Sequence, residues 1–373
     1  MRDYINIYKV RARLLLLLMA VVLVSCSDDS DRVEGETDTL QLVPYTHGRT
    51  DVSPSATRTV ETPSGYSDYF GPNSIGVFTT TTDNEAPAIR TFSCVNGHWN
   101  SQVNVTNTKE YFIYGYMPVN ENIDCEISRI SGKDYSQGAV LTFTNLPPVL
   151  AEDFSVVSGV LQVNSSNLDN ETGSLAAGNF RYVGMASGSN YVCLMLDHLY
   201  SAVQFKFLVN TTYNELRTIK LKKVEMMTDD QLTYPLTVTM KDQDPDGYEV
   251  NISNTGESLP NDYIDYISLF TSASGETLST SVENATFVNG YFAPKSNVAS
   301  KLRLRCTYDV YDKNVTEDHP NGNLVRKNCT AVNKLPSLAY GPNQRTILTL
   351  TVNPTYLYVL SDPDLDNPTV TIN

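Results

Sequence analysis

The segment 301–311 alternates between apolar and polar residues, and this period of two constrains the fold more than any other feature of the chain. In an extended strand, side chains with this period share one face. The apolar face here carries Leu302, Leu304, Cys306, Tyr308 and Val310. The segment 199–209 repeats the pattern. A strand with one apolar and one polar face is typical of an antiparallel sheet that packs on the core on one side and faces solvent on the other.

Further short runs rich in β-branched and aromatic residues lie between Gly, Asn, Pro and Asp, and no segment has a sustained helical period. At most one or two helical turns are expected, near 197–200. The sequence therefore predicts an all-β protein, a sandwich or a barrel. The expected strands are 75–80, 102–105, 110–117, 140–143, 154–163, 180–185, 346–352 and 356–360.

The first 25 residues have the pattern of a lipoprotein signal peptide. A basic leader precedes the apolar run 14–24, which is too short for a stable transmembrane helix. Ser25 stands directly before Cys26, so Cys26 is the predicted lipidation site and ties the chain to the outer membrane. The acidic run 27–31 resembles a surface-export signal, although a solvated linker would use the same residues. The alternative for Cys26 is ordinary cleavage that leaves an unmodified thiol.

The formal net charge is −15, and removal of residues 1–25 takes away four basic groups and one acidic group, which leaves −18. A surface this acidic repels phosphate backbones, so nucleic acid is not an expected partner. Five cysteines remain after Cys26, an odd number. Cys306 and Cys329 are the candidate disulfide pair. No CxxC pair is present, and neither a metal site nor a cofactor is predicted.

Catalytic signatures are missing from the sequence, which contains no HExxH, GxSxG, P-loop or GxGxxG motif. We therefore do not expect an enzyme. The run 242–247 begins like a calcium loop, but the twelfth position holds Ser253 where a bidentate Glu is required. A β-turn explains the same residues.

Four segments follow from composition. Residues 1–25 are the signal peptide, and 26–58 are a polar tether that contains one strand-like run at 39–45. Residues 59–188 and 189–373 are two β domains, divided near a Gly/Ser/Asn-rich stretch. A lone strand that is followed by an unpatterned linker is unusual for a compact domain.

Several motifs, in this order along the chain, resemble the fimbrillin-like family, the type V pilins and associated lipoproteins of Bacteroidetes. The matching segments are Ser-Ile-Gly-Val-Phe at 74–78, Trp99 with Tyr-Phe-Ile-Tyr-Gly-Tyr-Met-Pro at 111–118, Asp-His-Leu at 197–199 running into 203–207, and Tyr-Leu-Tyr-Val-Leu-Ser at 356–361 with 364–366.

The resemblance implies two tandem transthyretin-like antiparallel β-sandwiches and assembly with other pilin subunits by strand exchange. In such pilins a protease removes the first strand after an arginine, and Arg49 and Arg58 are the candidates here. A donated strand then fills the groove. The residues expected to take part in the exchange are Leu40 and Leu42 in the removed strand, and Leu348, Leu350 and Val352 in a donor segment at 346–373.

The C-terminal region lacks the tryptophan of many stalk pilins, because Trp99 is the only one. This favours a tip or accessory subunit, with host or bacterial surface receptors as further partners. The alternative function is a surface glycan-binding lipoprotein, in which Tyr111–Tyr116 stack on sugar rings.

Overall fold

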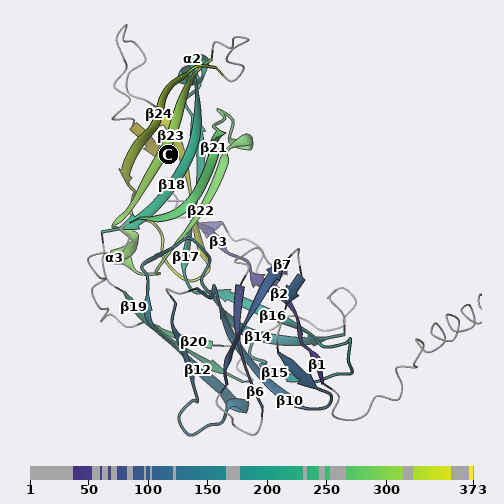
Figure 1. The fold of residues 1–373 in the computed structure, drawn as a ribbon. Helices are drawn as coiled ribbons and strands as arrows, with labels where there is room; N and C mark the ends of the chain where they lie inside the picture. Colours follow the sequence, from purple (N-terminus) through teal and green to yellow (C-terminus); the bar gives the residue numbers. More distant parts are fainter. Residues whose placement is uncertain are drawn as a thin grey trace, which may run out of the picture.

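The computed structural model describes residues 37–52, 59–60, 66–68, 74–81, 87–95, 98–100, 103–120, 123–164, 177–229, 233–242, 248–252, 266–313, 322–353 and 369–372. The strands form two lobes stacked end to end in an elongated molecule (Figure 1).

The first lobe contains a mixed sheet with strand order β5-β2-β16-β14-β10-β6-β7-β8, in which β15 also pairs with β10. Its strands are β2 (Gln41–His47), β5 (Tyr66–Asp68), β6 (Ser74–Thr81), β7 (Ile89–Val95), β8 (His98–Asn100), β10 (Glu110–Met117), β14 (Ser155–Val163), β15 (Arg181–Val183) and β16 (Tyr191–His198).

A second sheet of this lobe has the order β11-β12-β19-β20, and a small pair, β1-β9, lies beside them. Tyr116 of the first sheet meets Phe143 of the second edge to face, with ring centroids 5.1 Å apart, so the two sheets share a core. The elements are β1 (Thr37–Thr39), β9 (Asn104–Thr106), β11 (Cys125–Ser128), η2 (Tyr135–Gln137), β12 (Gly138–Leu146), β19 (Tyr234–Lys241) and β20 (Tyr248–Ile252).

The second lobe stacks a sheet of order β13-β22-β17-β25-β3-β4, with β26 also on β25, against a sheet of order β21-β18-β23-β24. Its elements are β3 (Thr50–Val52), β4 (Thr59–Val60), β13 (Val149–Leu150), β17 (Ser201–Val209), α2 (Thr211–Leu216), β18 (Arg217–Thr228), β21 (Ile267–Thr277), η4 (Val282–Asn284), β22 (Thr286–Phe292), α3 (Ser296–Ala299), β23 (Leu302–Asp312), β24 (Leu324–Lys334), β25 (Gln344–Asn353) and β26 (Thr369–Ile372).

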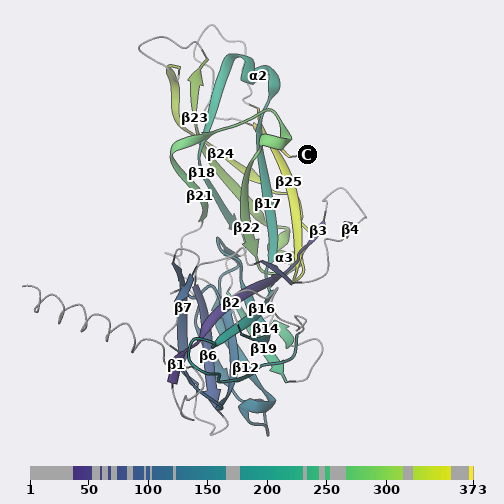
Figure 2. The ribbon, with the colours of Figure 1, turned by 90° about the vertical axis from the view of Figure 1, so that its right-hand side faces the viewer.

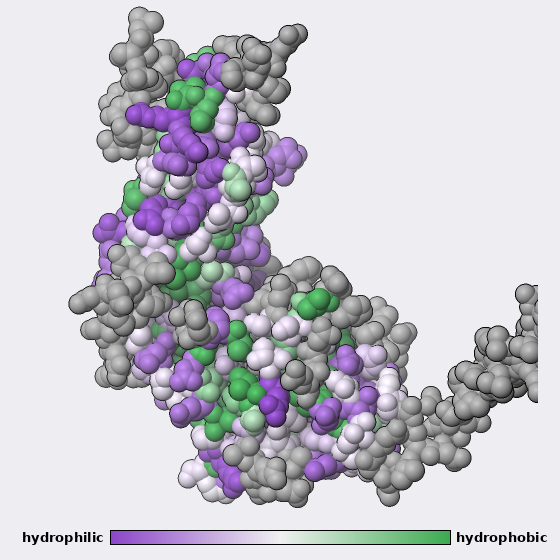
Figure 3. Space-filling model, viewed as in Figure 1, coloured by the Kyte–Doolittle hydropathy of each residue, from purple (hydrophilic) through white to green (hydrophobic). Residues whose placement is uncertain are grey.

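The predicted alternation is confirmed in β23, where Leu302, Leu304, Cys306, Tyr308 and Val310 are all fully buried. The residues between them on the other face are polar, and Figure 3 shows a mainly hydrophilic surface over β18, β21 and β23. The all-β sandwich prediction is therefore confirmed. Among the described residues, no helix is long and apolar enough to cross a bilayer.

Two sequence-based expectations differ from the structure. The helical turn expected near 197–200 is wrong, because β16 runs to His198, and the short helices α2 and α3 lie elsewhere. In addition, β16, β19 and β20 follow the expected domain boundary at 188/189 but hydrogen-bond with strands of the first lobe. The chain thus passes between the lobes more than once, which the order of residues alone does not reveal.

Candidate functional site

The N-terminal segment, defined here as residues 37–52, crosses from one lobe to the other (Figure 2). Its strands β1 and β2 belong to the first lobe, whereas β3 belongs to the second. Gly48 and Arg49 form the link between β2 and β3. One short stretch of chain therefore supplies a strand to each lobe.

Strand β2 lies close to an edge of its sheet. Residues 41–46 run parallel to 191–196 of β16, whereas β5 pairs with β2 only at Tyr45–His47. Pro44 has no N–H to contribute, which suits a strand with little pairing on one side. Leu40 is 0% exposed and Leu42 is 5% exposed, so both predicted strand-exchange residues lie in the core.

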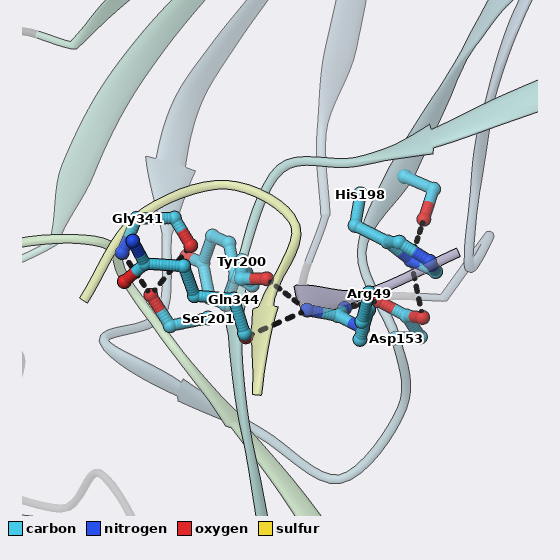
Figure 4. A network of polar contacts seen from close by, with 8 residues as sticks. Arg49, Asp153, His198, Tyr200, Ser201, Gly341 and Gln344 are labelled. Carbon is cyan, nitrogen blue, oxygen red and sulfur yellow. Dashed lines mark hydrogen bonds and ion pairs between the residues drawn. The ribbon is translucent and has the colours of Figure 1, made fainter. Parts of the chain in front are cut away.

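Arg49 lies in a buried polar cluster at the junction of the lobes (Figure 4). Its Nη2 is 2.6 Å from Oδ1 of Asp153, and the two side chains are 8% and 6% exposed. Its Nη1 donates to the carbonyl oxygens of Tyr200 and Gln344 at 2.9 and 3.2 Å. The guanidinium carbon lies 5.5 Å from the ring centroid of Tyr291. Arg49 thus contacts the start of β17, the start of β25 and β22 at once.

Asp153 also accepts a hydrogen bond from Nδ1 of His198 at 2.7 Å. We call Arg49, Asp153 and His198 the junction cluster. Burial by itself would raise the pKa of Asp153, but the charge and hydrogen bonds of Arg49 and His198 hold that pKa below its usual range. The carboxylate is therefore ionised within the interface between the lobes.

Together with Ser155, the residues His198 and Asp153 match a serine–histidine–aspartate triad in composition but not in geometry. Ser155 Oγ lies 3.2 Å from His198 Nδ1, the same nitrogen that faces Asp153. A catalytic relay needs the serine on Nε2 and the carboxylate on Nδ1. Ser155 is also 0% exposed. This arrangement holds structure together and does not activate a nucleophile.

A second ion pair lies two residues further along the N-terminal segment, at Asp51. Asp51 of β3 receives two hydrogen bonds from Arg345 of β25, at 2.6 and 2.9 Å. Strand β3 runs parallel to β25 over residues 50–52 and 344–346. Two charge pairs, one at Arg49 and one at Asp51, thus hold the N-terminal segment in place.

The predicted donor residues Leu348, Leu350 and Val352 are 0% exposed in β25. This strand lies between β17 and β3 and also pairs with β26 at residues 350–353. Donation of these residues to a neighbour would therefore remove a central strand from the chain's own lobe.

Other predicted site residues are not brought into this region. Cys26 and Arg58 lie outside the described residues. None of the five cysteines in the described part forms a disulfide. Cys306 lies opposite Ala331 and Cys329 opposite Tyr308, so the expected disulfide partners are diagonal neighbours. Diagonal positions are roughly 7–8 Å apart, more than a disulfide usually spans, which explains why this pair is not formed.

The structure bears on the glycan-binding alternative, whereas most of the calcium-like run lies outside the described residues. Tyr111, Tyr114 and Tyr116 are 6%, 0% and 2% exposed, so their rings fill the core and offer no surface for sugars. Residues 243–247 of the calcium-like run lie outside the described part, and β19 and β20 flank this run as an antiparallel hairpin. Within the described residues no group of His, Cys, Asp and Glu could hold a metal ion.

Sequence reasoning identified Arg49 only as a cleavage candidate and did not identify Asp153 at all. Asp153 follows Glu152 in a short loop, and neither its type nor its spacing points to Arg49. Only the pairing of β2 with β16 and of β3 with β25 brings these residues together.

No family model matches the chain, and no curated protein matches it. Among solved structures it is similar to a fimbrial protein from Bacteroides vulgatus, with 14% identity, coverage of 90% of this chain and 98% of that one, and a TM-score of 0.37. A cell adhesion protein from Bacteroides fragilis has 12% identity and a TM-score of 0.38, and the match covers 90% of this chain and 97% of that one. A fimbrial anchor protein from Porphyromonas gingivalis has 11% identity and a TM-score of 0.19, and the match covers 89% of this chain and 97% of that one. The structural neighbours are thus fimbrial and adhesion proteins.

Proposed function

We propose that this chain is a structural or adhesive subunit of a cell-surface fimbria of the fimbrillin-like type. In this proposal it is exported as a lipoprotein precursor, is anchored in the outer membrane through Cys26, and assembles with other subunits when a protease removes its N-terminal segment. A tip or accessory position is favoured over the stalk, and a receptor on a host or bacterial surface is the further partner.

The observation that carries the proposal is the course of the N-terminal segment through both lobes. Strand β2 has full-length pairing only with β16, and β3 is three residues long. Removal of β2 would leave the edge of β16 unpaired and would vacate the core positions of Leu40 and Leu42. A cut after Arg58 would also remove β3 from its place beside β25. A strand from a neighbouring subunit satisfies both needs together, because it supplies main-chain hydrogen bonds and apolar side chains.

The burial of Arg49 adds a condition to processing. A trypsin-like protease must take the arginine side chain into its own pocket, and this side chain is 8% exposed while it is paired with Asp153. Cleavage after Arg49 therefore requires local opening of the junction. Arg58 is the other candidate.

The proposal is tested by treating the precursor with an arginine-specific protease and following both the new N-terminus and the molar mass. We expect a product that begins at Thr50 or Thr59, followed by oligomers in light scattering when a subunit that can donate a strand is present. The control is the double variant Arg49→Lys with Arg58→Gln, which keeps a cation at position 49 but offers this protease no arginine in the region. A fully trimmed chain that stays monomeric at high concentration with every candidate partner would refute assembly by strand exchange.

A further inference from the structure

This inference rests on the proposed exchange of strands and concerns the chemistry of the incoming strand. Cleavage after Arg49 removes residues 37–49, and cleavage after Arg58 removes the whole N-terminal segment, so either cut takes away the Arg49 side chain. Asp153 does not leave, because it belongs to the loop before β14. It is 5% exposed, and of the junction cluster only His198 remains beside it.

The position that Arg49 vacates is built for a cation. It is lined by the Asp153 carboxylate, by the carbonyl oxygens of Tyr200 and Gln344, and by the ring of Tyr291. Each of these groups accepts hydrogen bonds or attracts positive charge, and none of them provides a donor to Asp153. A buried carboxylate that loses its cation is strongly destabilising, so an apolar side chain is a poor replacement here.

The chain's own C-terminal region does not supply such a cation. Residues 346–373 contain no Lys, Arg or His, and they carry acidic residues at Asp362, Asp364 and Asp366. A second copy that donated this region would bring additional negative charge towards Asp153. Charge complementarity therefore disfavours a polymer of this chain alone.

We propose that the strand which fills the vacated groove comes from a different protein and places an Arg or Lys side chain on Asp153, at the position of Arg49. Asp153 then selects partners by charge, since a donor without a basic residue at this position leaves the carboxylate with only His198 beside it.

The test measures rebinding of peptides to the trimmed chain. The starting protein is the Arg49→Lys precursor, in which an arginine-specific protease cuts this region only after Arg58, so that no new amino group forms beside Asp153. The peptides span residues 37–58 with Arg, Lys or Met at position 49, and a further peptide spans residues 346–373. Affinities are measured by isothermal titration calorimetry.

We expect the Arg and Lys peptides to bind with similar affinity, and the Met peptide and the 346–373 peptide to bind at least about tenfold more weakly. In an Asp153→Asn chain the preference for Arg over Met should disappear. The matched control is the Asp51→Asn substitution, which is made in the 37–58 peptides because residue 51 belongs to the peptide and not to the trimmed chain. It removes the charge pair with Arg345 and should lower all affinities without changing the order.

The outcomes separate this inference from the proposed function. Equal binding of the Arg and Met peptides to the wild-type groove, or tight binding of the 346–373 peptide, would overturn the charge requirement and leave strand exchange standing. Failure of every peptide to rebind would overturn strand exchange, and the charge requirement with it. If the Asp153→Asn chain does not fold, the Arg, Lys and Met series on the wild-type groove decides the question.

Discussion

Arg49 and Asp153 are 104 positions apart in the chain, and a 2.6 Å contact joins them across the junction of the lobes. A buried pair of this kind is only a modest source of stability as a whole, because both charges lose their hydration. Removal of one partner has a much larger effect, since the other charge stays buried. The junction cluster therefore acts mainly by making the presence of a cation at position 49 obligatory.

We expect Arg49→Met to lower the free energy of unfolding by about 3–5 kcal/mol, because Asp153 then remains buried without its cation. The double variant Arg49→Met with Asp153→Asn should recover most of this loss, since no buried charge is left. Urea denaturation of the four proteins in a double-mutant cycle measures the coupling. Additive losses, in which the double variant loses the sum of the two single variants, would show that the pair does not interact.

The lowered pKa of Asp153 also predicts how stability depends on pH. A carboxyl group whose folded-state pKa lies below its unfolded value, about 3.9, stabilises the fold above that value and loses the contribution as pH falls through the folded pKa. Asp38 and Glu225 have lowered pKa values as well and contribute in the same direction. Stability should therefore decrease from about pH 4 downwards. The stability of Asp153→Asn should decrease less steeply with falling pH. The same decrease as in the wild-type chain would contradict a contribution from Asp153.

At the scale of single elements, alternation between an apolar and a polar face predicts some strands, and β17 and β23 were predicted for this reason. Strand β19 was not predicted, although its burial alternates in the same way. Strand β18 was not, because its alternation is interrupted where the pairing register shifts between Leu221 and Lys223. The parallel pairing of β2 with β16 could not be predicted either, since neither the alternation at 39–45 nor the apolar residues after Tyr191 specify a partner strand, which is set by tertiary packing.

Strands β2 and β25 should respond differently to the loss of a core side chain. Leu42→Ala and Leu348→Ala each leave a cavity and should each lower the global stability by about 2–5 kcal/mol. Only Leu42→Ala weakens the N-terminal segment relative to the rest of the fold, so it should raise the rate of native-state cleavage at Arg49 by about tenfold or more. The cleavage rate of Leu348→Ala should stay within about threefold of wild type. Equal acceleration in both variants would mean that cleavage requires global unfolding.

At the scale of the whole molecule, the lobes are linked by more than their covalent connection. Strand β16 leads directly into β17, and the chain returns from β18 to the first lobe in β19 and β20. The N-terminal segment adds β1 and β2 to the first lobe and β3 to the second on top of this framework. Its removal should therefore open a groove in a molecule that stays folded, in contrast to the loss of a central strand.

Cys193 provides a reporter for this opening. It lies on β16 in register with Val43 of β2, and it is 0% exposed. In the intact precursor we expect a small maleimide to modify Cys94, which is partly exposed, faster than Cys125, because burial raises the pKa of the Cys125 thiol, and to leave Cys193 unmodified. After trimming, loss of β2 should expose Cys193, whereas Cys306 should stay protected inside the second lobe. Peptide mapping by mass spectrometry identifies the modified thiols, and addition of a strand that fills the groove should protect Cys193 again. Modification of Cys306 together with Cys193 would show that trimming unfolds the molecule and would rule out a stable open groove.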